Sequence, residues 1–311
     1  MSDRRAPAGP PRRGLFPGMG VPPMDEMPRV RTAVGRGIVA TWSSPVIVGG
    51  VLAWLLVEWL VVVALGYPGP IALLAHVPAP PPIGTITDYS LATGILGARG
   101  LGFIFVFAAV HALWQAVLTG LAIEAIESGR PSRWGAVRGL RGFPVAFAVR
   151  VIGLMALIAA QLLLAFGGSS GIGLLGQIGV FVIVTWLLAF APVIAVAERR
   201  RLFDCLGRSV RAARMPGSGN LTFAALYVIP VFATFFALPV PGVLLDVNPP
   251  ATAWLFVAAL NLLHTAMLAA LAMRYLAVQD QVPEAPPRRA PARQARDRSS
   301  ARAPGRRPSR R

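Results

Sequence analysis

The sequence lacks lysine and contains a single cysteine, Cys205. One cysteine cannot form an internal disulfide or build a cysteine-based metal cluster. Charged residues are also scarce, at 14% of the 311 residues, whereas 55% are hydrophobic. The mean hydropathy of +0.62 is too high for a soluble domain of this length. These features together predict that lipid surrounds most of the chain.

The basic residues are all arginine and give a formal net charge of +17. Such a charge indicates a nucleic-acid partner only when the basic residues gather on a folded, water-facing surface. Here they lie in tails and in short loops between apolar segments. No nucleic-acid partner is therefore expected. The exclusive use of arginine is typical of the codon bias of a GC-rich genome, which favours a bacterial source.

Six apolar segments are long enough to cross a bilayer, since a helix of about 20 residues spans its hydrocarbon core. They lie near residues 44–66, 100–123, 144–166, 172–197, 221–245 and 251–278. Helices are expected because backbone polar groups in lipid must pair within their own segment. Pro192 predicts a kink near the end of the fourth segment. The predicted fold is an all-α membrane protein with a bundle of about six transmembrane helices.

The arginines also predict the orientation, because positively charged short loops stay on the cytoplasmic side. In a six-span topology 29 of the 30 arginines fall on one side, and only Arg99 falls on the other. Both termini are therefore expected in the cytoplasm of a bacterial cell, with the protein in its inner membrane. The loops at 67–99, 167–171 and 241–250 are expected outside.

The two tails have compositions that cannot bury a core, being rich in arginine and proline. Residues 1–43 and 279–311 are predicted to be disordered cytoplasmic tails that flank a transmembrane domain at 44–278. Anionic lipids of the inner leaflet are the expected partner of the tail arginines, and an acidic protein or a nucleic acid is the alternative.

The two inner loops resemble one another in sequence. One contains Glu127, Trp134, Arg-Gly-Leu-Arg at 138–141 and Pro144, and the other Glu198, Phe203, Arg-Ser-Val-Arg at 208–211 and Pro216. Each loop is predicted to form a short amphipathic cytoplasmic helix on the inner membrane surface. The candidate lipid contacts are Arg138, Arg141, Arg208 and Arg211. The alternative is a pair of ordinary basic loops with a chance similarity.

These loop regions carry a resemblance to a known family. The second contains Ala191-Pro192-Val193-Ile194, Glu198, Leu206, Arg208-Ser209 and Arg214, and the first contains Gly129-Arg130-Pro131-Ser132, Ala136, Arg141 and Pro144. From about residue 100 to 275 the chain resembles bacterial proteins similar to the membrane domain of some glycerophosphoryl diester phosphodiesterases. The resemblance implies a membrane fold and carries over no activity, because the catalytic domain of such fusions is a separate soluble barrel.

Ionisable and amide side chains inside a spanning helix are costly and are candidates for function. The candidates are Glu58, His111 with Gln115, and Asn261 with His264. Each of the last two pairs shares a helix face. Helical rise places both histidines near mid-membrane and Glu58 about a turn further out. Glu58 is therefore expected to face His111 or His264, in a cluster that serves packing, solute binding or proton transfer. A divalent metal is a weaker alternative, since no tight ligand motif is present.

The sequence shows no nucleotide-binding loop, soluble catalytic domain or compact catalytic motif. A non-enzymatic scaffold or accessory of envelope assembly or transport, without a cofactor, is the first functional hypothesis. A small-solute or proton transporter that uses the mid-membrane cluster is the second. A rhomboid-like serine protease with Ser170 and His264 is the third. The spacing argues against a protease, because His264 is predicted about 20 Å deeper than Ser170, whereas nucleophile and base must lie about 3 Å apart.

Overall fold

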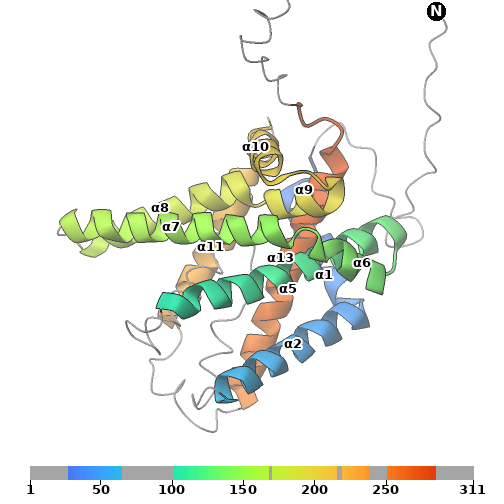
Figure 1. The fold of residues 1–311 in the computed structure, drawn as a ribbon, viewed down its shortest axis with the longest axis horizontal. Coiled ribbons are helices and arrows are strands. Elements are labelled where there is room, and N and C mark those ends of the chain that lie inside the picture. Colours follow the sequence, from blue (N-terminus) through green and yellow to red (C-terminus); the bar gives the residue numbers. More distant parts are fainter. Residues whose placement is uncertain (1–26, 65–100, 168–169, 216–218, 238–250, 285–311) are drawn as a thin grey trace, which may run out of the picture.

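The computed structural model describes residues 27–64, 101–167, 170–215, 219–237 and 251–284, and the regular structure in these ranges is helical (Figure 1). The helices are α1 (Val30–Trp42), α2 (Pro45–Ala64), α5 (Leu101–Ser128), α6 (Arg133–Leu140), α7 (Phe143–Gly167), α8 (Ser170–Leu188), α9 (Ala191–Glu198), α10 (Leu202–Ala213), α11 (Asn220–Ala237) and α13 (Ala251–Val278). The predicted all-helical class is confirmed.

Three helical stretches within these ranges are long and apolar enough to cross a membrane: residues 108–128 of α5, residues 178–198 of α8 and α9, and residues 261–278 of α13. Two bent pairs, α1 with α2 and α6 with α7, raise the number to five if each pair forms one span. The chain is therefore a membrane-embedded helical protein. The predicted segment at 221–245 continues beyond the described end of α11, so the number six stays a prediction.

Prolines mark the points where the helices bend. The angle is 78° between α1 and α2 and 54° between α6 and α7. Pro45 opens α2, and Pro144 is the second residue of α7. Proline fits the first turn of a helix, where its missing N–H breaks no hydrogen bond. Near Pro192, where a kink is predicted, the helix is interrupted between Leu188 and Ala191, and Pro192 lies in the first turn of α9. Residues 178–198 nevertheless form one candidate span, so the kink itself stays a prediction.

The helices α5, α9 and α13 contact one another and form the centre of the bundle (Figure 1). Around them, α7 packs on α5 and α8, α11 packs on α8, and α2 packs on α13. The largest buried apolar cluster joins α8 and α9 to α13, with Phe181, Phe190, Ile194 and Tyr275 among its members. The central helices therefore position the side chains discussed below.

Both tail boundaries differ from the sequence-based prediction. Residues 30–42, assigned above to the disordered tail, form α1, which packs along α13. Its contact face carries Ala33, Gly37 and Ala40, all buried, and such small residues let two helix backbones approach closely. At the other end Val282 is buried, so the packed structure continues to residue 284.

Candidate functional site

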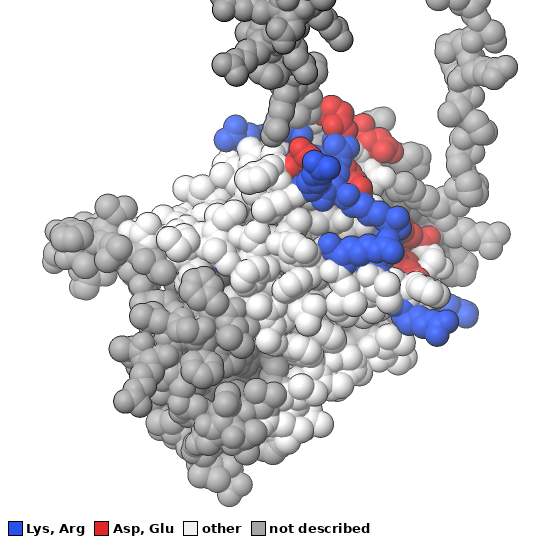
Figure 2. Space-filling view, viewed as in Figure 1, with Lys and Arg blue, Asp and Glu red and all other residues white. Residues whose placement is uncertain are grey.

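Charged side chains gather at one end of the molecule, while the rest of the face in view is largely uncharged wherever it is described (Figure 2). This arginine-rich end is formed by α6, α9, α10 and the chain that follows α13. Its arginines are Arg130, Arg133, Arg138, Arg141, Arg199, Arg200, Arg201, Arg208, Arg211 and Arg214. The α5–α13 seam, defined here as the contact between those two helices, lies deeper in the bundle and carries the polar residues singled out from the sequence.

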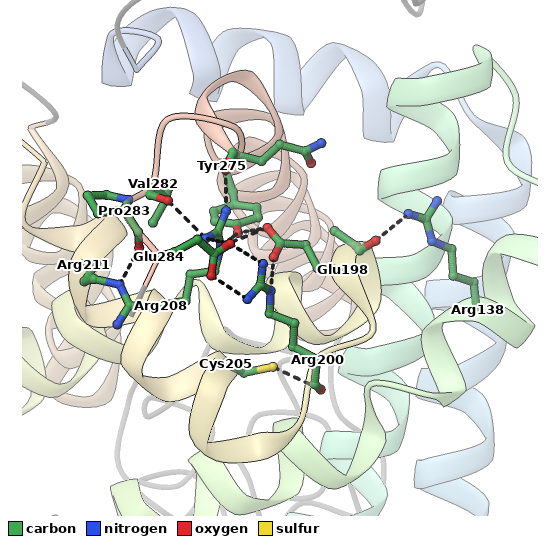
Figure 3. Close-up of polar contacts among 12 residues, drawn as sticks. Arg138, Glu198, Arg200, Cys205, Arg208, Arg211, Tyr275, Val282, Pro283 and Glu284 are labelled. Carbon is green, nitrogen blue, oxygen red and sulfur yellow. Dashed lines mark hydrogen bonds and ion pairs between the residues drawn. The ribbon is translucent and has the colours of Figure 1, made fainter. Parts of the chain in front are cut away.

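Arg208 on α10 is the centre of the polar network at the arginine-rich end (Figure 3). Only 4% of the residue is exposed. Its Nε donates to Tyr275 Oη at 2.9 Å and to a Glu198 carboxylate oxygen at 3.1 Å. The Tyr275 hydroxyl donates in turn to the same oxygen of Glu198. The three groups therefore form a closed triangle that joins α9, α10 and α13.

The same guanidinium holds the chain after α13 in place. Its terminal nitrogens donate to the carbonyl oxygens of Gln279 at 2.5 Å and Val282 at 3.1 Å. One of them also donates to Glu284 at 3.1 Å. Arg200 donates two hydrogen bonds to the Glu284 carboxylate, at 2.6 and 3.0 Å. Arg208 thereby gives partners to carbonyl groups of the irregular chain just beyond the end of α13.

These contacts shift the pKa values of the groups involved. The hydrogen bond from Arg200 holds the pKa of Glu284 below its usual value. Burial by itself lowers the pKa of Arg208, but its hydrogen bond with Tyr275 and the charge of Glu198 outweigh burial and raise it overall. Burial raises the pKa of Cys205 to about 12, followed by the nearby charge of Asp204. Cys205 is therefore a protonated, unreactive thiol at neutral pH.

Arg138 on α6 makes the corresponding contact in the first inner loop. It forms an ion pair with Glu127 at 2.5 Å, and it donates to the carbonyl oxygens of Val196 at 3.2 Å and Ala197 at 3.3 Å. Both charged side chains are partly exposed, at 25% and 33%. The similarity of the two loops is thus matched by similar contacts. In each, a glutamate at the end of a candidate membrane span binds an arginine on the next short helix.

The four arginines predicted to contact lipid have different surroundings. Arg208 is buried among protein partners, which replaces the lipid-contact interpretation for this residue. Arg138 directs its guanidinium to Glu127 and to the end of α9. Arg211 donates to the carbonyl oxygen of Pro283 at 2.7 Å. Arg141 is exposed. Sequence spacing alone did not separate these roles, because all four arginines share the same local pattern.

Glu124 fixes the start of α6, a role that the sequence analysis did not identify. Its carboxylate accepts hydrogen bonds from the Ser132 backbone N–H at 2.8 Å, the Ser132 hydroxyl at 2.6 Å and the Gly135 N–H at 2.8 Å. The first N–H groups of a helix have no intrahelical acceptor and attract negative charge. One carboxylate therefore holds α6 against α5.

In the α5–α13 seam, four of the five predicted mid-membrane residues have described side chains. All four are buried: His111, Gln115, Asn261 and His264. Leu118 of α5 and Leu268 of α13 belong to one buried cluster. His111 and Asn261 each lie seven residues before one of these leucines, hence two turns away on the same helix face. The helix register thus places His111 and Asn261 on the faces that the two helices turn toward each other.

Two of these residues, His264 and Gln115, have side-chain polar atoms without a hydrogen-bond partner among the described residues. His264 shares a hydrogen bond through Nδ1 with the Tyr227 hydroxyl of α11, and the two rings meet edge to face at 5.0 Å. Its Nε2 has no hydrogen-bond partner among the described residues. The same holds for both polar atoms of the Gln115 amide, although that residue is fully buried.

Glu58 lies on α2, one turn from Trp54, which stacks on Trp114 of α5 with ring centroids 4.8 Å apart. The Glu58 side chain lies outside the described ones, so its contact with either histidine stays a prediction. Ser170 begins α8, and its side chain is likewise outside the described ones. The Nδ1 atom of His264 is bonded to a tyrosine, which gives the protease hypothesis no support.

Two arginines on the predicted cytoplasmic side, Arg150 on α7 and Arg274 on α13, are fully buried. Arg274 donates to the carbonyl oxygen of Pro28 at 2.6 Å and to Asn220 Oδ1 at 2.7 Å, and its guanidinium lies 5.7 Å from the Phe223 ring centroid. The available signal was position, because both arginines fall inside apolar segments predicted to be helices.

Comparison with protein-family models, with curated proteins and with solved structures gives no match for this chain. The geometry of the arginine-rich end and of the α5–α13 seam therefore carries the functional interpretation.

Proposed function

We propose that this protein binds a small polar solute in the α5–α13 seam and carries it across the membrane. The observation that carries the proposal is the fully buried Gln115 amide, whose donor and acceptor atoms have no partner in the described part of the chain. In native proteins the large majority of buried side-chain polar atoms are hydrogen-bonded, and leaving one unpaired costs about 1–3 kcal/mol. A bound solute would supply the missing bonds.

The alternative role for these residues is helix packing through interhelical hydrogen bonds. Gln115 favours solute binding, since no such bond to its side chain is found among the described residues. The Nε2 atom of His264 offers a second buried polar group on the opposite helix. An amide and an imidazole suit a small solute with both donor and acceptor groups.

We further propose that the chain crosses a bacterial inner membrane six times with the arginine-rich end in the cytoplasm. The arginine distribution supports this orientation. Exposed aromatic side chains at that end, Trp134 and Phe203 at 64% and 75%, suit α6 and α10 to the membrane surface. The exposed Arg133 and Arg141 then face anionic headgroups. A fold like that of the phosphodiesterase membrane domains is part of the same proposal.

A flux assay tests the transport proposal. The purified protein is reconstituted in liposomes and offered radiolabelled amino acids, nucleosides, sugars and polyols, and Gln115→Leu is compared with the parent. Uptake of at least one solute, reduced tenfold or more by Gln115→Leu, is the expected result. The matched control is Leu113→Ala, which alters an exposed position on the same helix and should leave uptake unchanged.

Absence of uptake for every solute, with Gln115→Leu folding normally, would contradict the transport proposal. The non-enzymatic scaffold is then the better interpretation. Its supporting observation is the arginine-rich end, where Arg208 and Arg138 bind the ends of neighbouring helices and hold them in fixed positions.

A further inference from the structure

Two segments of the chain repeat one structural unit. Unit one consists of α5, α6 and α7, and unit two consists of α8 with α9, α10 and α11. In each unit the first helical stretch runs to the arginine-rich end, a short helix folds back on it, and a long helix returns. In the first, α6 packs on α5 so closely that a Cβ atom on Gly139 would collide with the carbonyl oxygen of Ala116. In the second, Ser209 of α10 occupies the matching place and donates its hydroxyl to the carbonyl oxygen of Leu187 at 2.7 Å.

These two contacts align the units residue by residue. Glu127 lies eleven residues after Ala116, and Glu198 lies eleven residues after Leu187. The arginines that bind the two glutamates, Arg138 and Arg208, directly precede Gly139 and Ser209. The glutamate–arginine pair is therefore an equivalent feature of both units.

A third unit is formed by the two ends of the described chain. Here α13 runs to the arginine-rich end, α1 folds back on it, and α2 returns from Pro45. A Cβ atom on Gly37 would collide with the carbonyl oxygen of Ala266, just as Gly139 does with Ala116. Arg36 directly precedes Gly37, as Arg138 precedes Gly139.

A second contact supports this alignment. Eight residues after the contacted carbonyl, unit one has Glu124 and unit three has Arg274. Glu124 accepts from the N–H of Ser132 at the start of α6, and Arg274 donates to the carbonyl oxygen of Pro28 just before α1. The charges are opposite, but both side chains tie the long helix to the start of its short helix.

The arginine of each of the first two units also holds the next unit. Arg138 of unit one binds carbonyl groups at the end of α9, which belongs to unit two. Arg208 of unit two binds carbonyl groups just beyond the end of α13, which belongs to unit three. Two of the three joints between units are thereby closed at the arginine-rich end.

The third joint, between unit three and unit one, differs from the other two. The position of Glu127 and Glu198, eleven residues after the contacted carbonyl, is occupied in unit three by Ala277. Across the described ranges, no hydrogen bond or ion pair joins Arg36 to another residue. This joint includes the α5–α13 seam, with its buried polar residues Gln115 and His264.

We infer that the bundle opens to the arginine-rich end at the joint between units three and one, which gives a small polar solute access to the α5–α13 seam. Opening any joint separates packed helices, but the other two joints also require arginine contacts to break. The identity of the cargo rests on the proposed function, whereas the opening itself is measurable without a solute.

Distances between pairs of spin labels in liposomes test the opening, in a Cys205→Ser or Cys205→Ala background. Labels at Arg31 on α1 and Val137 on α6 report the joint between units three and one, called the unlatched joint because it lacks the glutamate–arginine pair. Labels at Val137 on α6 and Phe203 on α10 report the joint between units one and two, called the latched joint because Arg138 closes it. All three positions are exposed. Two distance populations are expected across the unlatched joint and one across the latched joint, and Arg138→Gln should add a second population to the latched joint.

Restoring the missing carboxylate gives the sharpest variant. In Ala277→Glu the new carboxylate should pair with Arg36 and reduce the population with the longer label distance at least fivefold. Ala277→Gln, which has a side chain of matched size, should not reduce it. Adding Arg36→Gln to Ala277→Glu should bring the longer population back. Equal behaviour of the two joints, or equal effects of glutamate and glutamine at 277, would overturn the inference. If the distances change as expected while no solute is taken up, the transport proposal fails and the opening stands.

Discussion

The arginine-rich end and the α5–α13 seam differ in whether their buried polar side chains have hydrogen-bond partners. Arg208 is 4% exposed and donates to Tyr275, Glu198, Glu284 and two carbonyl groups. Gln115 is fully buried, and its amide has no partner in the described residues. Both burials cost desolvation, but only the first is offset by contacts within the protein. Pairing, more than burial, therefore separates a structural polar group from one that is available to a ligand.

Removal of Arg208 should have the largest effect on stability. Arg208→Met removes the donor to Tyr275 and to the carbonyl groups of Gln279 and Val282. It also removes one of the donors to Glu198, which keeps its hydrogen bonds from Arg200 and Tyr275. Loss of one partner of a buried ion pair costs about 3–5 kcal/mol. We expect the free energy of unfolding in detergent to fall by about 3 kcal/mol, measured by SDS-induced unfolding with tryptophan fluorescence as readout.

The matched control is Arg211→Met on the same helix. Arg211 makes one hydrogen bond to the carbonyl oxygen of Pro283, at an exposed site. Its loss should cost about 1 kcal/mol or less. If the two variants lose equal stability, the network around Arg208 contributes no more than an exposed arginine does.

Replacement of Gln115 should have the opposite sign. Gln115→Leu removes a desolvated amide that has no described partner and keeps a similar volume, so the free energy of unfolding should rise by about 1–2 kcal/mol. The same unfolding assay applies. Thr119→Val is the control, because the Thr119 hydroxyl donates to the backbone carbonyl oxygen of Gln115 at 2.7 Å and its loss should lower stability slightly. A large loss of stability in Gln115→Leu would show that the amide serves packing.

Much of the helical framework was predictable because a long apolar segment in the sequence directly indicates a helix that lipid can surround. The segment predicted at 251–278 coincides with α13, and that at 144–166 differs from α7 by one residue at each end. The segment at 100–123 begins one residue before α5 and ends five residues before it. The helix α1 was missed because the Pro, Gly and Arg content of the first 43 residues masked a stretch without proline, residues 30–42. Composition averaged over a window conceals a short helix that is stabilised by its neighbour.

The candidate site was only partly predictable. The buried polar positions on α5 and α13 follow from residue type within an apolar run, which is a local signal. The partners do not, since Tyr227 lies 37 residues from His264 and Tyr275 lies 67 residues from Arg208. Because these partners are distant in sequence, the spacing predicted Arg208 to be an exposed lipid contact, although its guanidinium is buried among protein groups. Long-range pairing depends on how helices pack, and the spacing of residues along one helix carries no information about it.

A smaller effect should follow from the ion pair between Glu127 and Arg138. A double-mutant cycle with Glu127→Gln and Arg138→Gln measures their coupling energy by the same unfolding assay. Because both side chains are partly exposed, we expect a coupling of about 0.5–1 kcal/mol. A coupling energy equal to the stability lost in Arg208→Met would show that the partly exposed Glu127–Arg138 pair contributes as much as the buried contacts of Arg208.

The smallest effect concerns the chain after α13 and depends on pH. Arg200 holds the pKa of Glu284 below its usual value, so the docked state is stabilised above the pKa of the undocked carboxyl, and this contribution is lost as the pH falls through the lowered pKa. A spin label at the exposed Asp280 should therefore stay immobile at neutral pH and gain mobility in acid, below the usual pKa of a glutamate. Glu284→Gln should reduce this pH dependence, and Arg200→Gln should shift the midpoint upward toward the usual value. Because the Glu284 side chain is 66% exposed, solvent screens the pair and the change should be modest. Mobility that is unchanged by acid in the parent would show that the carbonyl contacts of Arg208 hold this segment without help from Glu284.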